Sequence, residues 1–224
     1  MIEEMTVKAL YDLSHTKAEP LLKKAAYPWE ALGDIKDFII ALGSTLSEEL
    51  YERRGEFIWI ARTAKVAPTA SINGPVIIGE NTEVRHCAFI RGNALVGDGA
   101  VVGNSTELKN VILFDGVQVP HYNYVGDSIL GYKSHMGAGS ITSNVKSDKA
   151  LVTVKSPMGN LETGRKKFGA MLGDFVEVGC GTVLNPGSVV GPHTNIYPLS
   201  MVRGYVPAHS VYKRAGEVVE MRED

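Results

Sequence analysis

One short segment, Val119–Ser128, gathers residue types that are needed for proton transfer. His121 stands there with Asn123, Tyr124 and Asp127 close behind it. An imidazole flanked by polar groups can be held neutral in one tautomer and can accept a proton near neutral pH. His121 is therefore a candidate general base, and a surface histidine without a catalytic role is the alternative.

Two further segments could contact a ligand. Residues 137–144 read GAGSITSN, and such small residues let a cofactor or a partner chain approach the backbone closely. Residues 145–166 are rich in Lys and Arg, and loops of this length are usually functional or disordered. We expect this stretch to leave the main fold as a loop with a short hairpin, and its charge favours an anionic ligand.

A repeat after Trp59 must position these segments. Aliphatic residues recur at every sixth position in two runs, first Val66, Ile72, Ile78, Val84, Ile90, Val96, Val102 and Leu108, and later Leu172, Val178, Leu184, Val190, Ile196 and Val202. This period is typical of a parallel β-helix, in which each hexad makes one strand and one turn and three hexads make a coil. The sequence predicts about six or seven coils. A β-sandwich with frequent glycine turns is the alternative.

Residues 1–60 have a helical pattern instead. A helix is predicted from Asp34 to Leu42, ended by Gly43, and Ser44 or Ser47 could begin another that reaches Tyr51. A stack of coils leaves two open ends, and terminal elements usually cap them. We therefore expect a helical N-terminal cap over residues 1–60, a β-helix domain over 61–212 with its loop at 145–166, and a C-terminal tail over 213–224.

Composition excludes several classes of protein. A net charge of −2 argues against general binding to nucleic acid or to an anionic membrane. The two cysteines provide neither a disulfide framework nor a four-thiolate zinc site. The acidic start and the lack of a long apolar run argue against a signal peptide and a membrane span. We expect a soluble, cytoplasmic protein.

Four strings in order carry a resemblance to a known family: GNSTELK (103–109), HYNYVGD (121–127), GAGSITSN (137–144) and GRKKFGAMLGD (164–174). They resemble the left-handed β-helix domain of the bifunctional UDP-N-acetylglucosamine pyrophosphorylase/glucosamine-1-phosphate acetyltransferases. The resemblance is stronger to the archaeal sugar-1-phosphate nucleotidylyltransferases that carry an amino-sugar acetyltransferase domain. It implies an all-β fold with a left-handed parallel β-helix and a short α-helical N-terminal region.

The resemblance also implies roles for individual residues. The general base of the family falls on His121, and its phosphate and sugar contacts fall on Arg91, Lys109, Tyr124, Asn144 and Lys167. Its acetyl and pantetheine path passes His135, Gly137, Ala138 and Cys180. The chain departs from the family at two of these positions, where His135 replaces a common Asn and Cys180 replaces a Ser. A buried, inert Cys180 is favoured over a reactive thiol.

The implied activity is an acetyl-CoA-dependent N-acetyltransferase that acts on an amino-sugar 1-phosphate in UDP-N-acetylglucosamine biosynthesis. It needs no metal, works as a homotrimer with sites between protomers, and stabilises its oxyanion with backbone N–H groups near Gly137–Gly139. Residues 1–60 leave no room for the doubly wound sheet of the pyrophosphorylase half.

Two other functions remain open. The chain could be a non-catalytic sugar-nucleotide-binding or trimeric assembly module, because His135 and Cys180 depart from the family and the nucleotidyl-transfer half is missing. It could instead be a metal hydratase similar to γ-class carbonic anhydrases. That family needs a pair of closely spaced histidines. Here His121 and His135 are far apart in the sequence, and position 126 is a glycine and not a histidine.

Overall fold

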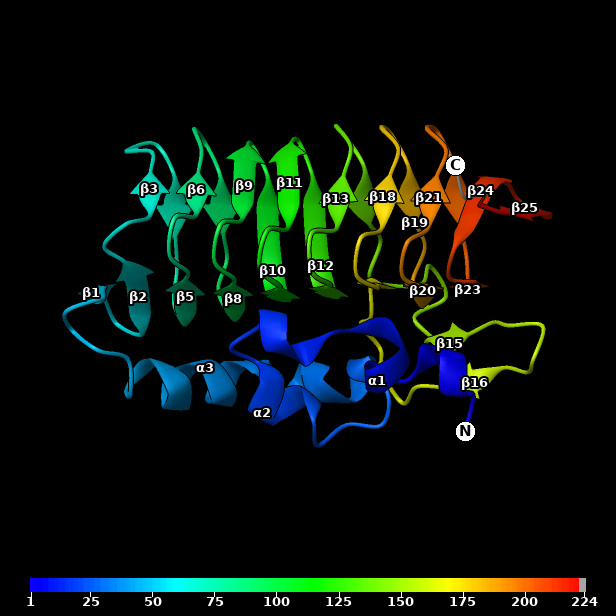
Figure 1. The fold of residues 1–224 in the computed structure, drawn as a ribbon, viewed down its shortest axis with the longest axis horizontal. Coiled ribbons are helices and arrows are strands. Elements are labelled where there is room, and N and C mark those ends of the chain that lie inside the picture. Colours follow the sequence, from blue (N-terminus) through cyan, green and yellow to red (C-terminus); the bar gives the residue numbers. More distant parts are fainter. Residues whose placement is uncertain (222–224) are drawn as a thin grey trace.

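The computed structural model describes residues 1–221, most of which wind into one long parallel β-helix (Figure 1). Short strands of successive coils lie side by side and in parallel, and they form three faces. Two of these faces stack eight parallel strands each, so the solenoid is longer than the six or seven coils expected. The predicted fold, a left-handed parallel β-helix with a short helical N-terminal region, is confirmed.

The covered face and the third face share the two longest strands, β10 (Glu107–Leu113) and β12 (Tyr124–Leu130), and the second face is a separate sheet. The covered face contains β2 (Ile58–Ala61), β5 (Val76–Ile78), β8 (Ala94–Val96), β10, β12, β17 (Ala170–Leu172), β20 (Ser188–Val190) and β23 (Tyr205–Val206). The second face contains β3 (Lys65–Val66), β6 (Glu83–Val84), β9 (Val101–Asn104), β11 (Gln118–His121), β13 (His135–Met136), β18 (Glu177–Val178), β21 (Asn195–Ile196) and β24 (Ser210–Arg214). The third face contains β4 (Ser71–Ile72), β7 (Phe89–Ile90), β14 (Ile141–Thr142), β19 (Val183–Leu184), β22 (Met201–Val202) and the first residues of β10 and β12.

The six-residue repeat forms the core of the solenoid. Every repeat position from Ile78 to Val202 is buried, whereas Val66 and Ile72, in the first coil, are only partly buried. The coils approach closely, since a Cβ on Gly103 would lie 1.7 Å from the carbonyl oxygen of Pro120 in the next coil. Inward-facing aliphatic residues and small residues between the coils thus produce the stack, as the spacing predicts.

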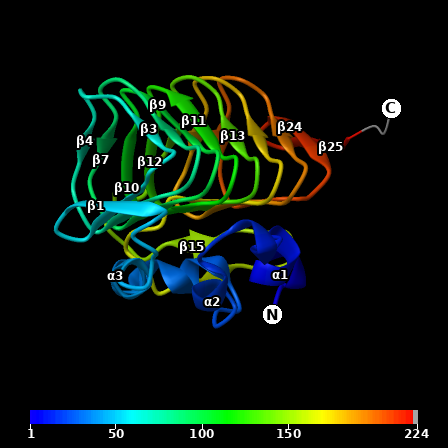
Figure 2. The same cartoon turned by 60° about the vertical axis from the view of Figure 1, so that its left-hand side comes forward.

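The N-terminal segment lies along the side of the β-helix and does not cap its end (Figures 1 and 2). It contains α1 (Val7–Leu10), α2 (Glu19–Leu22) and α3 (Ile35–Gly43), joined by the 3-10 turns η1 (Glu3–Met5), η2 (Leu13–His15) and η3 (Pro28–Gly33). Helix α3 packs on β5, β8 and β10, and η3 packs on β12. Helix α3 matches its predicted range, but turns replace the helix expected to reach Tyr51.

The covered face explains this placement. All three residues are buried in β5, β8, β17 and β20, so these strands are apolar on their outer side as well. An apolar outer surface must be covered, and the N-terminal helices cover it. The prediction of an end cap did not take this outer surface into account. At the ends of the solenoid, β1 (Tyr51–Gly55) pairs antiparallel with β2 and β25 (Glu217–Glu220) pairs antiparallel with β24. The expected domain limits at residues 60 and 213 therefore fall inside β2 and β24, and residues 222–224 of the expected tail lie outside the described residues.

The basic loop forms the predicted hairpin. Strand β15 (Thr153–Val154) pairs antiparallel with β16 (Leu161–Glu162). Val152 and Val154 are fully buried, and they anchor the hairpin beside the N-terminal helices on the same side of the β-helix (Figure 1). None of the helices in residues 1–221 is long and apolar enough to cross a membrane.

Candidate functional site

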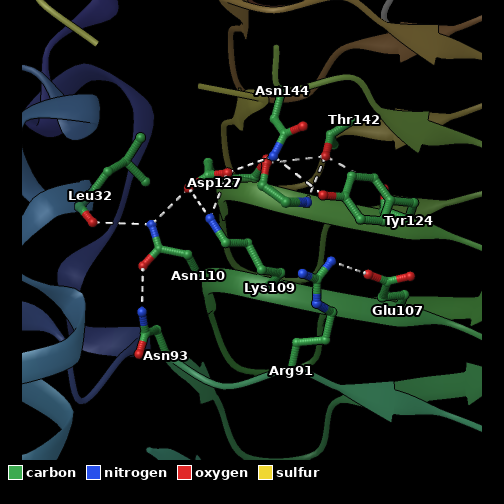
Figure 3. A network of polar contacts seen from close by, with 12 residues as sticks. Leu32, Arg91, Asn93, Glu107, Lys109, Asn110, Tyr124, Asp127, Thr142 and Asn144 are labelled. Atoms are coloured by element: carbon green, nitrogen blue, oxygen red, sulfur yellow. Dashed lines mark hydrogen bonds and ion pairs between the residues drawn. The ribbon is translucent and has the colours of Figure 1, made fainter. Parts of the chain in front are cut away.

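A ladder of polar side chains runs along the corner between the third face and the covered face (Figure 3). Successive coils contribute Arg91, Lys109, Asp127 and Asn144. The register sets this alignment, because Leu108 of β10 lies beside Ile90 of β7 and Lys109 lies beside Gly126 of β12. Residues that lie about one coil apart in the sequence thus become neighbours in space.

Asp127 is the centre of this ladder. Its side chain is only 5% exposed, and its Oδ1 lies 2.9 Å from the Lys109 Nζ. Asn110 donates a further hydrogen bond of 3.0 Å to the same oxygen, and Asn144 donates to the other oxygen. A buried carboxylate is costly unless charged and polar donors surround it, and three donors do so here. Lys109 and Asn144 are therefore held in fixed positions.

Arg91 and Tyr124 complete the polar surface. Arg91 donates to Glu107 over 2.8 Å, and this hydrogen bond raises the pKa of the guanidinium. The Tyr124 hydroxyl accepts from Asn144 at 3.2 Å. Burial, and then the charge of Asp127, raises the pKa of Tyr124, so the phenol keeps its proton at neutral pH and can donate it to a ligand. The structure thus brings together Arg91, Lys109, Tyr124 and Asn144, whose binding roles remain predictions.

The N-terminal segment forms a wall of this site, which sequence reasoning missed. The side chain of Asn110 donates to the carbonyl oxygen of Leu32 in η3 over 3.1 Å. Arg165, from the segment after the hairpin, donates to the carbonyl oxygen of Glu30 in the same turn. No local sequence motif predicts these contacts, because each joins residues far apart in the sequence.

Lys167 lies beside the ladder. Its neighbour Phe168 donates its backbone N–H to the carbonyl oxygen of Asn144 over 3.0 Å. The Lys167 side chain is exposed. It forms no ion pair with any residue of the described part of the chain. The backbone next to Lys167 is therefore joined to Asn144 of the ladder, and the contact of Lys167 with a sugar remains a prediction.

His121 lies at the opposite edge of the third face, at the corner that joins it to the second face. The residue is exposed, and its ring makes no hydrogen bond within residues 1–221. The expectation that Asn123, Tyr124 and Asp127 hold the ring was wrong. Asn123 instead accepts from the His121 backbone at 3.1 Å and donates to the carbonyl oxygen of Gly137, while the other two face the ladder. Asn123 therefore fixes the corner backbone and leaves the imidazole free.

The residues of the predicted acetyl path stack along the His121 corner. Gly139 donates its backbone N–H to the His121 carbonyl oxygen over 3.0 Å, and Gly181 donates to that of Ala138 over 2.9 Å. His121, Ala138 and Cys180 therefore occupy equivalent positions in successive coils. Cys180 is exposed, so the expectation of a buried thiol was wrong: the residue sits on the outer side of a turn.

The backbone donors of this corner are not equivalent. The Gly137 N–H is bound to the Val178 carbonyl oxygen at 2.7 Å, and the Gly139 N–H is bound to His121. Among residues 137–139, Ala138 alone keeps an N–H without a hydrogen bond to the described residues, and its side chain is exposed. The N–H of Cys180, in the next coil, also has no such partner. The expected set of oxyanion donors is thus reduced to Ala138. His135 lies three residues earlier on the second face, where its Nδ1 is 2.8 Å from the Glu177 Oε2.

Residues 1–221 contain no group of three His, Cys, Asp or Glu side chains arranged to hold a metal ion. The two corners of the third face differ in their polar groups: one has a free imidazole and a free N–H, and the other has a set of paired cations and amides.

Comparisons with known proteins give relatives of the expected kind. A bifunctional sugar-1-phosphate nucleotidylyltransferase/acetyltransferase from Sulfurisphaera tokodaii is 29% identical over 155 residues, covering 61% of this chain and 39% of that protein. The bifunctional protein GlmU from Methanococcus maripaludis is 31% identical over 217 residues, covering 88% of this chain and 49% of that protein. The chain thus spans less than half the length of either relative. Among solved structures, a hexapeptide transferase family protein from Anaplasma phagocytophilum is 18% identical with a TM-score of 0.43, covering 75% of this chain and 80% of that one.

The resemblance to bifunctional nucleotidylyltransferase/acetyltransferases, including archaeal ones, is confirmed by these relatives. A family profile described as the GMPPB C-terminal domain matches residues 72–204, which is the β-helix from its first coils to β22. Because this match covers more than half of the chain, the chain belongs to the GMPPB C-terminal domain family.

Proposed function

We propose that the chain is an acetyl-CoA-dependent N-acetyltransferase that acts on an amino-sugar 1-phosphate. The observation that carries this proposal is the arrangement of the third face, which has a free imidazole at one edge and a fixed polar ladder at the other. An acceptor lying across Tyr124 could present its amine to His121 while its hydroxyl and phosphate groups contact Arg91, Lys109 and Asn144. The relatives named as acetyltransferases support the same reaction class.

In this mechanism His121 removes a proton from the sugar amine as the nitrogen attacks the thioester carbonyl of acetyl-CoA. A C–N bond forms, the C–S bond breaks, and the coenzyme A thiolate leaves and takes up a proton. The Ala138 N–H is the donor available to the oxyanion. Space for the thioester exists there, because no atom would lie within 4 Å of a Cβ on Gly139.

A homotrimer completes the proposal. Large apolar side chains are exposed around the His121 corner and the third face, including Tyr122 (62%), Leu199 (85%) and Met201 (65%). Grouped apolar residues on a surface commonly mark a protein interface. Packing of a second copy against this face would bury them and would place the acetyl-CoA path between protomers. Light scattering of the full chain should give the mass of a trimer, and a monomeric mass would contradict this part.

The activity is tested by thiol release from acetyl-CoA with glucosamine-1-phosphate or galactosamine-1-phosphate as acceptor. Acceptor-dependent release by the wild-type chain is expected, with a strong loss in His121→Asn. His86→Asn is the matched control, because His86 lies at the same corner two coils away and its ring is engaged by Thr69 at 2.7 Å. Absence of both turnover and coenzyme A binding would overturn the enzyme proposal.

A non-catalytic sugar-nucleotide-binding module is the second candidate, and one observation favours it. No described residue orients the His121 ring, whereas an efficient general base usually has such a partner. Saturable binding of a sugar nucleotide without acetyl-CoA affinity or thiol release would support the binding module and reject the acetyltransferase.

A further inference from the structure

A second basic region lies beside the ladder, under the hairpin. A cavity of about 620 Å³ opens there between residues that follow β14, β19 and β22 and residues of the hairpin segment. Ser143, Asn185 and Arg203 line it from three successive coils, because Thr142 pairs with Leu184 and Leu184 with Val202. The cavity therefore continues the corner of the ladder beyond Asn144.

The charge of this cavity differs from that of the ladder. The cavity is lined by the cations Lys146, Lys155 and Arg203 and by one carboxylate, Asp148. Asp148 is 3.1 Å from Lys146, and that lysine is thereby compensated. Within residues 1–221, Lys155 and Arg203 form no ion pair, although Arg91 and Lys109 each have a carboxylate partner. Two cations without a counter-charge in one polar cavity attract an anion.

The cavity is also fixed in shape. Val152 and Val154 are fully buried, so the base of the hairpin is anchored in the core. The Lys155 carbonyl oxygen accepts the backbone N–H of Tyr205 over 2.8 Å, which ties it to the coil that carries Arg203. Gly204 makes this approach possible, since a Cβ there would lie 2.3 Å from the same oxygen. The backbone of Lys155 is thus joined to the coil that carries Arg203 before any ligand arrives.

We propose that this cavity is a separate binding site for a phosphate or diphosphate group, held by Lys155 and Arg203 with Asn185 and Ser143 as neutral donors. Phosphate esters match paired cations and amide donors, and Arg binds them with two parallel hydrogen bonds. If the chain is the proposed acetyltransferase, either the acceptor or coenzyme A supplies this group. Only the source of the phosphate rests on the proposed function.

Calorimetric titration of the full chain with inorganic pyrophosphate tests the site without turnover. Replacing both cations, as Lys155→Met with Arg203→Met, should weaken binding by at least about tenfold, because each charge-assisted contact contributes substantially. Lys36→Met with Lys65→Met removes the same charge from exposed positions elsewhere and should leave the affinity within about twofold, as expected for screened surface charges. Equal affinity of the cavity variant and the wild type, or loss of binding in Arg91→Met alone, would overturn the proposal.

Steady-state kinetics then distinguishes the source. If coenzyme A supplies the phosphate, the double variant raises the KM for acetyl-CoA but not for acetyl-pantetheine, which lacks the diphosphate. If the acceptor supplies it, the KM for the amino-sugar phosphate rises instead. Unchanged KM values for all three compounds would contradict a role in either co-substrate. The chain could bind pyrophosphate through Lys155 and Arg203 and yet release no thiol from acetyl-CoA. That result would support the phosphate site and reject the proposed acetyl transfer.

Discussion

The two edges of the third face differ in how their polar groups are used. At the ladder corner, Arg91 and Lys109 have carboxylate partners and Asn144 bridges Tyr124 and Asp127. At the His121 corner, neither the imidazole nor the Ala138 N–H has a hydrogen-bond partner in residues 1–221. The polar groups of the ladder corner are therefore held in place by partners within the chain, whereas the His121 corner keeps a donor and an acceptor free. A binding surface benefits from the first property and a reacting group needs the second.

The largest expected effect separates rate from stability at the His121 edge. His121→Asn should lower kcat by about 10²–10⁴-fold, since it removes the proposed general base. The free energy of unfolding should change by less than about 0.5 kcal/mol, because an exposed ring without a hydrogen bond is lost. Thiol-release kinetics and urea denaturation measure the two quantities. If the free energy of unfolding fell by as much as the activation free energy rose, the proposed difference between the two edges would be contradicted.

The opposite behaviour is expected at the ladder. Lys109→Met removes the charge partner of the buried Asp127, and we expect a loss of about 2–3 kcal/mol in the free energy of unfolding, below the range for a fully buried pair because Lys109 is itself partly exposed. Arg91→Met is the matched control: Glu107 is one-third exposed, so losing its partner should lower the free energy of unfolding by less than Lys109→Met does. Urea denaturation of both variants measures the difference, and equal losses would show that Asp127 does not depend on Lys109.

The hairpin cavity gives a test of intermediate size. Gly204→Ala would place a Cβ 2.3 Å from the Lys155 carbonyl oxygen, at a backbone φ of +79°. We expect it to destabilise the protein by about 1–3 kcal/mol more than Gly216→Ala and to weaken pyrophosphate binding. Gly216 has a nearly equal φ of +81° but has open space around the same position. If both alanine variants unfold at the same urea concentration, the hairpin is not held by the contact at Gly204.

The smallest effect concerns the Tyr124 hydroxyl. Tyr124→Phe removes one proposed hydrogen-bond donor to the acceptor, so the KM for the acceptor should rise by the equivalent of about 0.5–1.5 kcal/mol. Burial and the neighbouring carboxylates raise the pKa of Tyr124, so its proton is retained as the pH rises through neutrality toward the ordinary value for a phenol. The KM ratio of variant to wild type should therefore stay constant from pH 7 to about pH 9. A ratio that falls toward one over this range would mean that the phenol ionises early.

Much of the fold could be predicted from the sequence because the repeat is local. Each hexad carries its own inward residue, and coils of nearly constant length place Arg91, Lys109 and Asn144 in one ladder. The hairpin was also predictable, since it interrupts that period. Ile129 of β12 pairs with Met171 of β17 directly, as if the inserted loop were absent.

The contacts between distant segments could not be predicted in the same way. No spacing relates Leu32 to Asn110, or Lys155 to Tyr205, because these segments meet only after the solenoid has formed. The helices were expected at an open end, since the hexads do not reveal that one face is apolar on its outer side as well. Contacts between distant segments also determine three further features that the sequence does not reveal. These are the partners of Asp127, the exposure of Cys180 and the cavity under the hairpin.

The proposed function depends above all on His121, which we propose to drive acetyl transfer to an amine presented on the third face. Single-turnover acetylation of glucosamine-1-phosphate and galactosamine-1-phosphate, followed by mass spectrometry of the N-acetyl product, tests it most directly. We expect product from at least one acceptor with wild type and with His86→Asn, and a rate lower by about 10²–10⁴-fold with His121→Asn. Equal product formation by wild type and His121→Asn would contradict it.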